Sequence, residues 1–143
     1  MSGVKAKYPD FAAGEVVALP QFAEPGRGAL GVAECGASVP FNVTRAFYLY
    51  DMPTDAVRGE HAHHETHQFL ICLAGAMEAT LWDRTGKRSI TVDSPAMGLY
   101  VRPMIWLTLV NRSPGTICLV LTSTNFEEAD YIRDAKEFAG LID

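Results

Sequence analysis

The chain has 143 residues, of which 48% are hydrophobic and 20% are charged, and its net charge is −5. We therefore expect one globular domain over residues 1–143 with a core of useful size. No apolar run is long enough for a membrane helix, and the N-terminal stretch lacks the apolar centre of a signal peptide. These features predict a cytoplasmic protein without a membrane partner. The negative charge argues against general nucleic-acid binding, whereas locally gathered arginines would still suit an anionic small ligand.

The chain reads mainly as strands. Residues 1–40 are rich in Gly, Pro and Ala and predict loops with one or two short strands. Alternating β-branched and aromatic residues then predict strands at 41–51, 67–75, 98–111 and 116–126, and a hairpin over 77–93 that turns at Thr85-Gly86. Only residues 126–143, acidic early and with lysine later, predict a helix. The expected fold is an all-β sandwich or barrel flanked by a short C-terminal helix.

Two stretches resemble known functional motifs, but their structural context or spacing does not fit those motifs. The stretch Gly26–Gly31 spells a dinucleotide-binding fingerprint, but no strong strand precedes it and no helix follows, so we interpret it as a turn. The segment His64–His67 resembles a zinc-protease motif, but its histidines are three apart rather than four. Cys72 and Cys118 lie in apolar runs and are predicted to be small buried residues.

All four histidines lie between positions 61 and 67. His61 and His63 are two residues apart and should point to the same face of a strand. With Gln68 and Gly75 they match the spacing of the first cupin motif, in which Gln68 takes the place of a glutamate. A later strand usually supplies a fourth ligand, but this chain has Leu107 or Thr108 there.

Three interpretations of His61 and His63 remain open. Two imidazoles and a neutral amide make a poor site for a divalent ion, so we predict no metal and no cofactor. A polar strand end exposed to water is a second interpretation, and solvent exposure is the prediction for His64 and His67. The third is acid–base chemistry, because histidine titrates near neutral pH and a positioned base contributes about 10²–10⁴ in rate.

Three blocks together resemble the nucleotide-sugar 3,4-ketoisomerases of the cupin superfamily. They are "RGEHAHHETHQ", "DSPAMGLYVRPMIW" and "DYIR", and the similarity extends over about residues 26–138. The resemblance implies a jelly-roll barrel and a homodimer that exchanges N-terminal strands. It also implies metal-free transfer of the keto group of dTDP-4-keto-6-deoxyglucose from C4 to C3 through an enediol, in the supply of sugars for surface polysaccharide.

The resemblance also implies roles for individual residues. His63 matches the family's base and His61 its partner, which relays protons or holds the oxygen. Arg45 matches an arginine that contacts the diphosphate, and Arg27 matches a second arginine near the nucleotide. Arg58 and Gln68 match family positions at the edge of the site, and Tyr100 and Trp106 match positions near the barrel wall. Arg102 replaces a family glycine and adds charge near the site. For Tyr100 and Trp106, core packing is the alternative interpretation. For the arginines, it is a solvated surface (Arg27) or a structural ion pair (Arg45).

Two departures bear on the transfer of function. Phe47 stands where the family has a tyrosine, and Leu107 replaces the histidine of a Trp-His pair. Both changes remove polar groups from the expected site. A non-catalytic nucleotide-sugar binding module and a metal-dependent cupin using His61, His63 and Gln68 are therefore the alternative functions.

Overall fold

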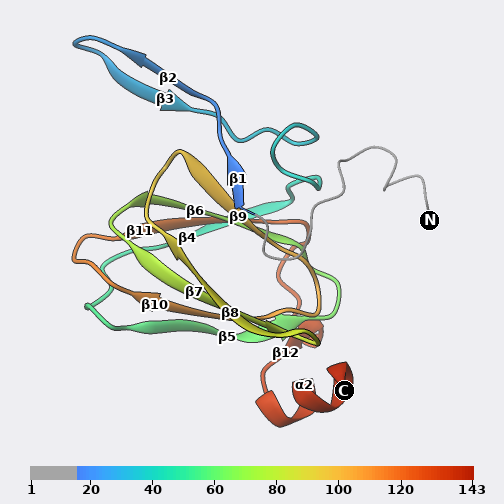
Figure 1. Cartoon of the computed structure of the whole chain (residues 1–143). Helices are drawn as coiled ribbons and strands as arrows, with labels where there is room; N and C mark the ends of the chain where they lie inside the picture. Colours follow the sequence, from blue (N-terminus) through green and yellow to red (C-terminus); the bar gives the residue numbers. More distant parts are fainter. Residues whose placement is uncertain (1–15) are drawn as a thin grey trace.

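The structure, a computed structural model, describes residues 16–143. Two five-stranded antiparallel sheets face each other, and a separate two-stranded hairpin projects from one end (Figure 1). The first sheet has the order β1-β9-β6-β11-β4, with the bounds Val16–Ala18, Met97–Val101, Gln68–Ala74, Ile117–Thr122 and Arg45–Leu49. The second has the order β12-β5-β10-β7-β8, with the bounds Tyr131–Ile132, Val57–His63, Trp106–Asn111, Met77–Asp83 and Gly86–Val92.

This strand order is that of a jelly-roll sandwich, because most neighbours in each sheet are distant in sequence. The all-β prediction is confirmed. Within the described residues, the two five-stranded sheets are separate and do not join into one closed barrel.

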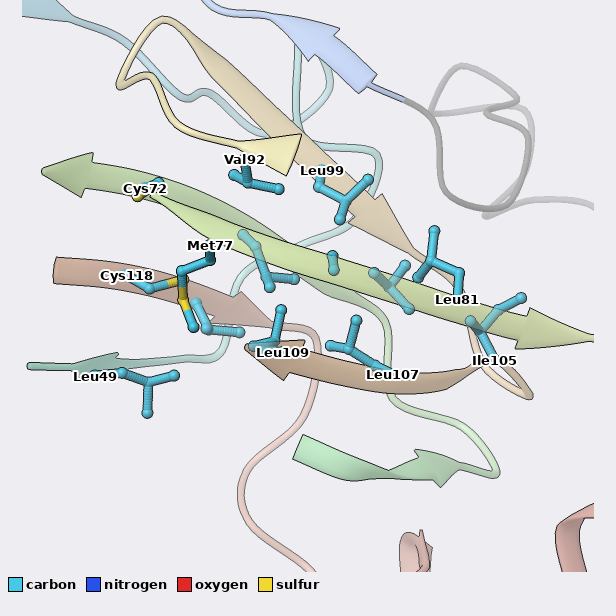
Figure 2. Packing of buried hydrophobic residues seen from close by; sticks show 14 residues of the cluster. Leu49, Cys72, Met77, Leu81, Val92, Leu99, Ile105, Leu107, Leu109 and Cys118 are labelled. Atoms are coloured by element: carbon cyan, nitrogen blue, oxygen red, sulfur yellow. The ribbon is translucent and has the colours of Figure 1, made fainter. Parts of the chain in front are cut away.

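The main core lies between the two sheets. On β7 the side chains of Met77, Ala79 and Leu81 point inward, and the residues between them are only partly buried. This period of two is what a strand with one buried face requires. Figure 2 shows these residues meeting others from both sheets, including the buried Cys72 and Cys118, as predicted.

Two smaller clusters cover the outer faces of the sheets. Phe41, Phe69 and Tyr100 pack on the outer side of the first sheet. On the other side, Phe138 of helix α2 (Ala135–Ile142) packs against Trp82 and Trp106, with ring centroids 5.0 and 5.6 Å apart.

The tail contains a shorter helix than the sequence predicts. Residues 126–143 form the 3₁₀ turn η1 (Glu128–Asp130), the strand β12 and then α2. The helix begins only after Asp134, whose carboxylate accepts a hydrogen bond from the Lys136 N–H as an N-cap. The prediction of helix at 126–134 is wrong, because burial of Ile132 and pairing with β5 override local propensity there.

The predicted strand at 98–111 is two strands. The chain leaves β9 after Val101 and enters β10 at Trp106. Between them Pro103 cannot donate to a ladder and Met104 adopts a left-handed conformation at φ 63°. The break carries the chain from the first sheet to the second.

Of the predicted N-terminal region 1–40, the structure describes residues 16–40, and these contain three short strands rather than one or two. After β1, the strands β2 (Gln21–Glu24) and β3 (Gly28–Gly31) form the projecting hairpin. Gly26 and Gly28 have positive φ at its turn. The interpretation of Gly26–Gly31 as a turn is confirmed for Gly26 and Arg27 only, because Gly28–Gly31 pair as β3. Phe22 and Leu30 are 61% and 59% exposed on this hairpin. Within residues 16–143 no helix has the length and apolarity to cross a membrane.

Candidate active site

A cavity of about 320 Å³ lies between the two sheets. This is at the lower end of the volume of small-molecule sites. Its walls come from β4, β5, β6, β10, β11 and β12, and the lining residues are Phe47, Leu49, Val57, Arg58, Gly59, His61, Gln68, Leu70, Leu107, Leu109, Val120, Tyr131 and Arg133.

A bulge in β5 positions the first histidine. The pairing of β5 with β10 shifts register between Leu107 and Thr108, which pair with His61 and Gly59. The extra residue, Glu60, and Gly59 before it both have positive φ. Glycine is needed at 59 because a Cβ there would lie 2.7 Å from the Leu107 carbonyl oxygen. The bulge turns His61 toward the cavity.

The Nδ1 atom of His61 lies 3.0 Å from the Gly59 carbonyl oxygen. A carbonyl can only accept, so Nδ1 carries the proton and Nε2 is left as a lone pair. Burial lowers the pKa of His61 to about 4, and the neighbouring His63 contributes in the same direction. His61 is therefore a neutral imidazole near neutral pH.

His63 is buried and is held by a carboxylate. Its Nδ1 lies 2.9 Å from Oδ2 of Asp130. Burial lowers the pKa of His63, although the hydrogen bond and charge of Asp130 oppose that shift. Burial alone would raise the pKa of Asp130, but hydrogen bonds from Thr66, His63 and the Glu65 N–H bring it below its usual value. The ionised carboxylate accepts from Nδ1, and so Nε2 of His63 is also a lone pair.

The two free Nε2 atoms differ in their surroundings. His61 lines the cavity, whereas Nε2 of His63 is covered and has no hydrogen-bond partner within the described residues. The imidazole planes are perpendicular with centroids 5.0 Å apart, and the Tyr131 ring lies 4.3 Å from His63 and 4.9 Å from His61. The burial of His63 contradicts the interpretation of this pair as a strand end exposed to water.

Strand β12 and the residues on either side of it supply side chains that the sequence had not placed in the site. Tyr131 and Arg133 line the cavity, and Asp130 holds His63. The "DYIR" block contains these three residues and could have indicated them. The sequence predicted a helix there, however, and a helix would not pair with β5. In the structure Tyr131 pairs directly with His63.

Three arginines give the site a positive character. Arg58 and Arg133 line the cavity. Arg45 stacks over Phe47 at 5.1 Å and is close enough to lower the pKa of His63. Arg133 also forms two hydrogen bonds to Glu128, at 2.7 and 3.0 Å. Arginine is a side chain suited to binding anions, and two of these three line the cavity.

The remaining cavity wall is largely apolar. Phe47 and Leu107, which replace polar family residues, both line it. Gln68 is buried on β6 and faces the same space. The polar side chains that line the cavity are therefore those of His61, Gln68, Tyr131, Arg58 and Arg133.

Four predicted site residues lie away from both the cavity and the two histidines. Tyr100 packs on the outer face of the first sheet and its hydroxyl lies 2.7 Å from Nδ1 of His67. Trp106 packs under α2. Arg102 lies 3.5 Å from Asp83, and Arg27 pairs with Glu24 at the tip of the projecting hairpin. The single chain does not bring these four to His61 and His63.

The flanking histidines differ from each other. His64 is exposed, as predicted. His67 is half-buried, bonds to Tyr100 and stacks near Phe41, so the prediction of solvent exposure is wrong for it. Among residues 16–143 no group of three or more His, Cys, Asp or Glu side chains is placed to hold a metal ion.

Comparisons with known proteins show the family to which the chain belongs. The family described as FdtA, WxcM-like, C-terminal, matches residues 13–143. The chain belongs to this family. A TDP-4-oxo-6-deoxy-α-D-glucose-3,4-oxoisomerase from Aneurinibacillus thermoaerophilus is 38% identical over 116 residues, which cover 81% of this chain and 84% of that protein.

Two solved structures are similar over nearly their whole length. QdtA, a sugar 3,4-ketoisomerase from Thermoanaerobacterium thermosaccharolyticum in complex with TDP, is 30% identical with a TM-score of 0.85, covering 90% of this chain and 93% of that one. A 3,4-ketoisomerase from Helicobacter canadensis is 34% identical with a TM-score of 0.85, covering 90% and 96%.

Proposed function

We propose that this protein is an isomerase that moves the keto group of a TDP-linked 4-keto-6-deoxy sugar between C4 and C3. The observation that carries the proposal is a pair of neutral histidines with free Nε2 atoms beside an arginine-rimmed cavity. The 3,4-ketoisomerase relatives supply the reaction class.

The reaction needs a base that removes a proton from C3 and returns it to C4. His63 removes the proton from C3, and the electron pair forms a C3–C4 double bond, which leaves an enediolate with its negative charge on the C4 oxygen. Nε2 of His61 takes the proton of the C3 hydroxyl and passes it to the C4 oxygen. His63 then returns its proton to C4 as the C3 oxygen becomes the carbonyl. The net change is one C=O moved and no proton gained or lost.

Because Nε2 of His63 is covered, the sugar reaches it only when the rings of His61 and Tyr131 shift. Those rings lie closest to His63 in the site. Exclusion of water from this region protects the enediol and strengthens the interaction of His63 with Asp130.

The diphosphate is the part of the ligand that the arginines hold. In a chain of net charge −5, Arg45, Arg58 and Arg133 form a local positive site at the cavity. Arg45→Ala should weaken TDP binding by about 1.5–3 kcal/mol, the range for hydrogen bonds to a charged group. Calorimetry with TDP measures this. Unchanged affinity in the variant would remove Arg45 from the site.

We also propose a homodimer in which the hairpin of one chain crosses to its partner. Phe22 and Leu30 on the hairpin are exposed, and an apolar cleft on the outer face of the first sheet includes Ile71, Leu73 and Leu119. Such a crossing would carry Arg27 away from its own cavity toward the partner. Tyr100 and Trp106 are assigned core packing, and Arg102 is assigned its pair with Asp83.

Deuterium exchange tests the isomerase directly. Wild type in D₂O should exchange the C3 proton of TDP-4-keto-6-deoxyglucose, and His63→Asn should lose nearly all exchange while still binding TDP. His64→Asn, the same change at an exposed neighbour, is the control and should exchange normally. A chelator should have no effect. Wild type that binds TDP but exchanges no deuterium would leave the non-catalytic binding module as the function, and loss of exchange with chelator would favour the metal-dependent cupin.

A further inference from the structure

The carboxylate of Asp130 is fixed on both of its oxygens. Oδ1 accepts from the Glu65 N–H at 2.7 Å. Oδ2 accepts from Nδ1 of His63 at 2.9 Å and from the Thr66 hydroxyl, which also contacts the Thr124 hydroxyl at 2.7 Å. Asp130 therefore holds its orientation independently of any ligand, and it lies behind His63 without lining the cavity itself.

This arrangement separates the two histidines chemically. Both have Nδ1 occupied and Nε2 free, but His61 is held by a neutral carbonyl and His63 by a carboxylate. A base in a ketoisomerase must keep a proton from the moment C3 loses it until C4 receives it. During that time the base is an imidazolium, and a buried positive charge is costly without a partner. Within the described residues only His63 has such a partner.

We propose that Asp130 is a positioning residue, which holds His63 in the Nδ1–H tautomer and offsets the charge of its imidazolium form. His63, and not His61, then carries the proton between C3 and C4. This inference rests on the proposed function. Other charged and titratable groups around His63 do not replace Asp130: Arg45 and Arg133 are cations, His61 is a neutral imidazole, and Glu128 is paired with Arg133.

Asp130→Asn tests the assignment with almost no change in size. The amide of the new side chain can donate to Nδ1, which would move the proton of His63 to Nε2, the atom that has to accept from C3. We expect nitrogen-15 NMR to report Nδ1–H in wild type and Nε2–H in D130N. The exchange rate kcat should fall by about 10²–10⁴, as for a base held in the wrong tautomer, with TDP affinity unchanged.

The pH profile separates this role from a purely structural one. The carboxylate raises the pKa of His63 against the effect of burial, so its removal should move the acidic limb of kcat/KM to lower pH. Asp130→Glu keeps the charge and should restore part of the rate and the wild-type limb. Glu65→Gln removes an exposed acidic side chain next to the network and is the matched control, which should behave as wild type.

Two results would overturn the proposal. One is an Nε2–H tautomer of His63 in active wild type, a measurement that does not depend on the folding of any variant. The other is a D130N protein that switches tautomer but exchanges deuterium at the wild-type rate. A wild type with the Nδ1–H tautomer and no isomerase activity would instead fail the proposed function, and the proton-carrying role of His63 with it.

Discussion

At the scale of single residues, the partner of Nδ1 decides what each histidine can do. His61 donates to a backbone carbonyl and His63 to the Asp130 carboxylate. Burial lowers the pKa of both rings, and more clearly that of His61, to about 4. The site therefore keeps two neutral acceptors side by side near neutral pH, which a pair of exposed histidines would not provide as reliably.

The same burial makes stability depend on pH. Below the unfolded pKa of about 6.5 the unfolded chain binds protons that the folded protein resists, so the free energy of unfolding should fall as pH is lowered toward 4. At pH 5, His61 should account for about 1–2 kcal/mol of this fall in the free energy of unfolding, after allowance for its partial exposure. Urea denaturation at pH 7 and pH 5 measures how much unfolding free energy each protein loses between the two pH values. His61→Gln should lose less than wild type, and His64→Gln should lose as much as wild type. An equal loss in both variants would contradict the prediction.

At the scale of elements, short irregular segments position the site. The bulge in β5 turns His61 inward, and the two-residue strand β12 brings Tyr131 beside His63. Neither segment contributes much to the core between the sheets. Each is held by a backbone feature, the left-handed Gly59 in one case and the pairing with β5 in the other.

Gly59→Ala should disturb the bulge. The added methyl would meet a backbone oxygen at 2.7 Å in a left-handed conformation, so we expect about 1–3 kcal/mol loss of stability together with reduced activity. Gly115→Ala is the matched control, because Gly115 has φ 74° and open space around its Cβ position. Denaturant unfolding should show a larger loss for Gly59→Ala. Equal losses would mean that only backbone conformation, and not the close approach to β10, matters at position 59.

Helix α2 should depend on one aromatic residue. Phe138 is fully buried against Trp82 and Trp106, so Phe138→Ala should lower the free energy of unfolding by about 3–5 kcal/mol. Leu141→Ala, on the same helix but 45% exposed, should cost far less. Thermal and urea melts of the two variants measure the difference. Similar values would show that α2 is held by its caps and backbone rather than by this ring.

At the scale of the whole molecule, the projecting hairpin lies at the end opposite α2 (Figure 1). We propose that the hairpin end, and not the α2 end, contacts a partner chain. Large apolar side chains on a hairpin that extends away from its own sheets are costly to leave in water. The outer face of the first sheet provides an apolar surface of matching character. The proposed exchange of hairpins between two chains would cover both of these apolar surfaces.

Charge on that outer face should therefore break the dimer. Leu73 is 46% exposed beside the cleft, and Leu73→Lys should convert dimer to monomer in light scattering coupled to size-exclusion chromatography. Leu141→Lys places the same charge on an equally exposed leucine of α2 and should leave the dimer intact. A wild-type monomer, or a dimer that tolerates Leu73→Lys, would contradict the proposed interface.

Residue pattern alone determined most of the fold class and part of the site. Period-two burial on β7, the hairpin over 77–93 and the same-face pair His61 and His63 all depend on local spacing, which the sequence displays directly. Local spacing does not predict the bulge at Gly59 or the strand at 131–132, because each exists only through pairing with a strand distant in sequence. For the same reason the partnership of His63 with Asp130, 67 positions apart, was decided by tertiary structure, as was the placement of Tyr100 and Trp106 on outer faces. Spacing tells which side chains share a face, and only the packing of the sheets tells what that face meets.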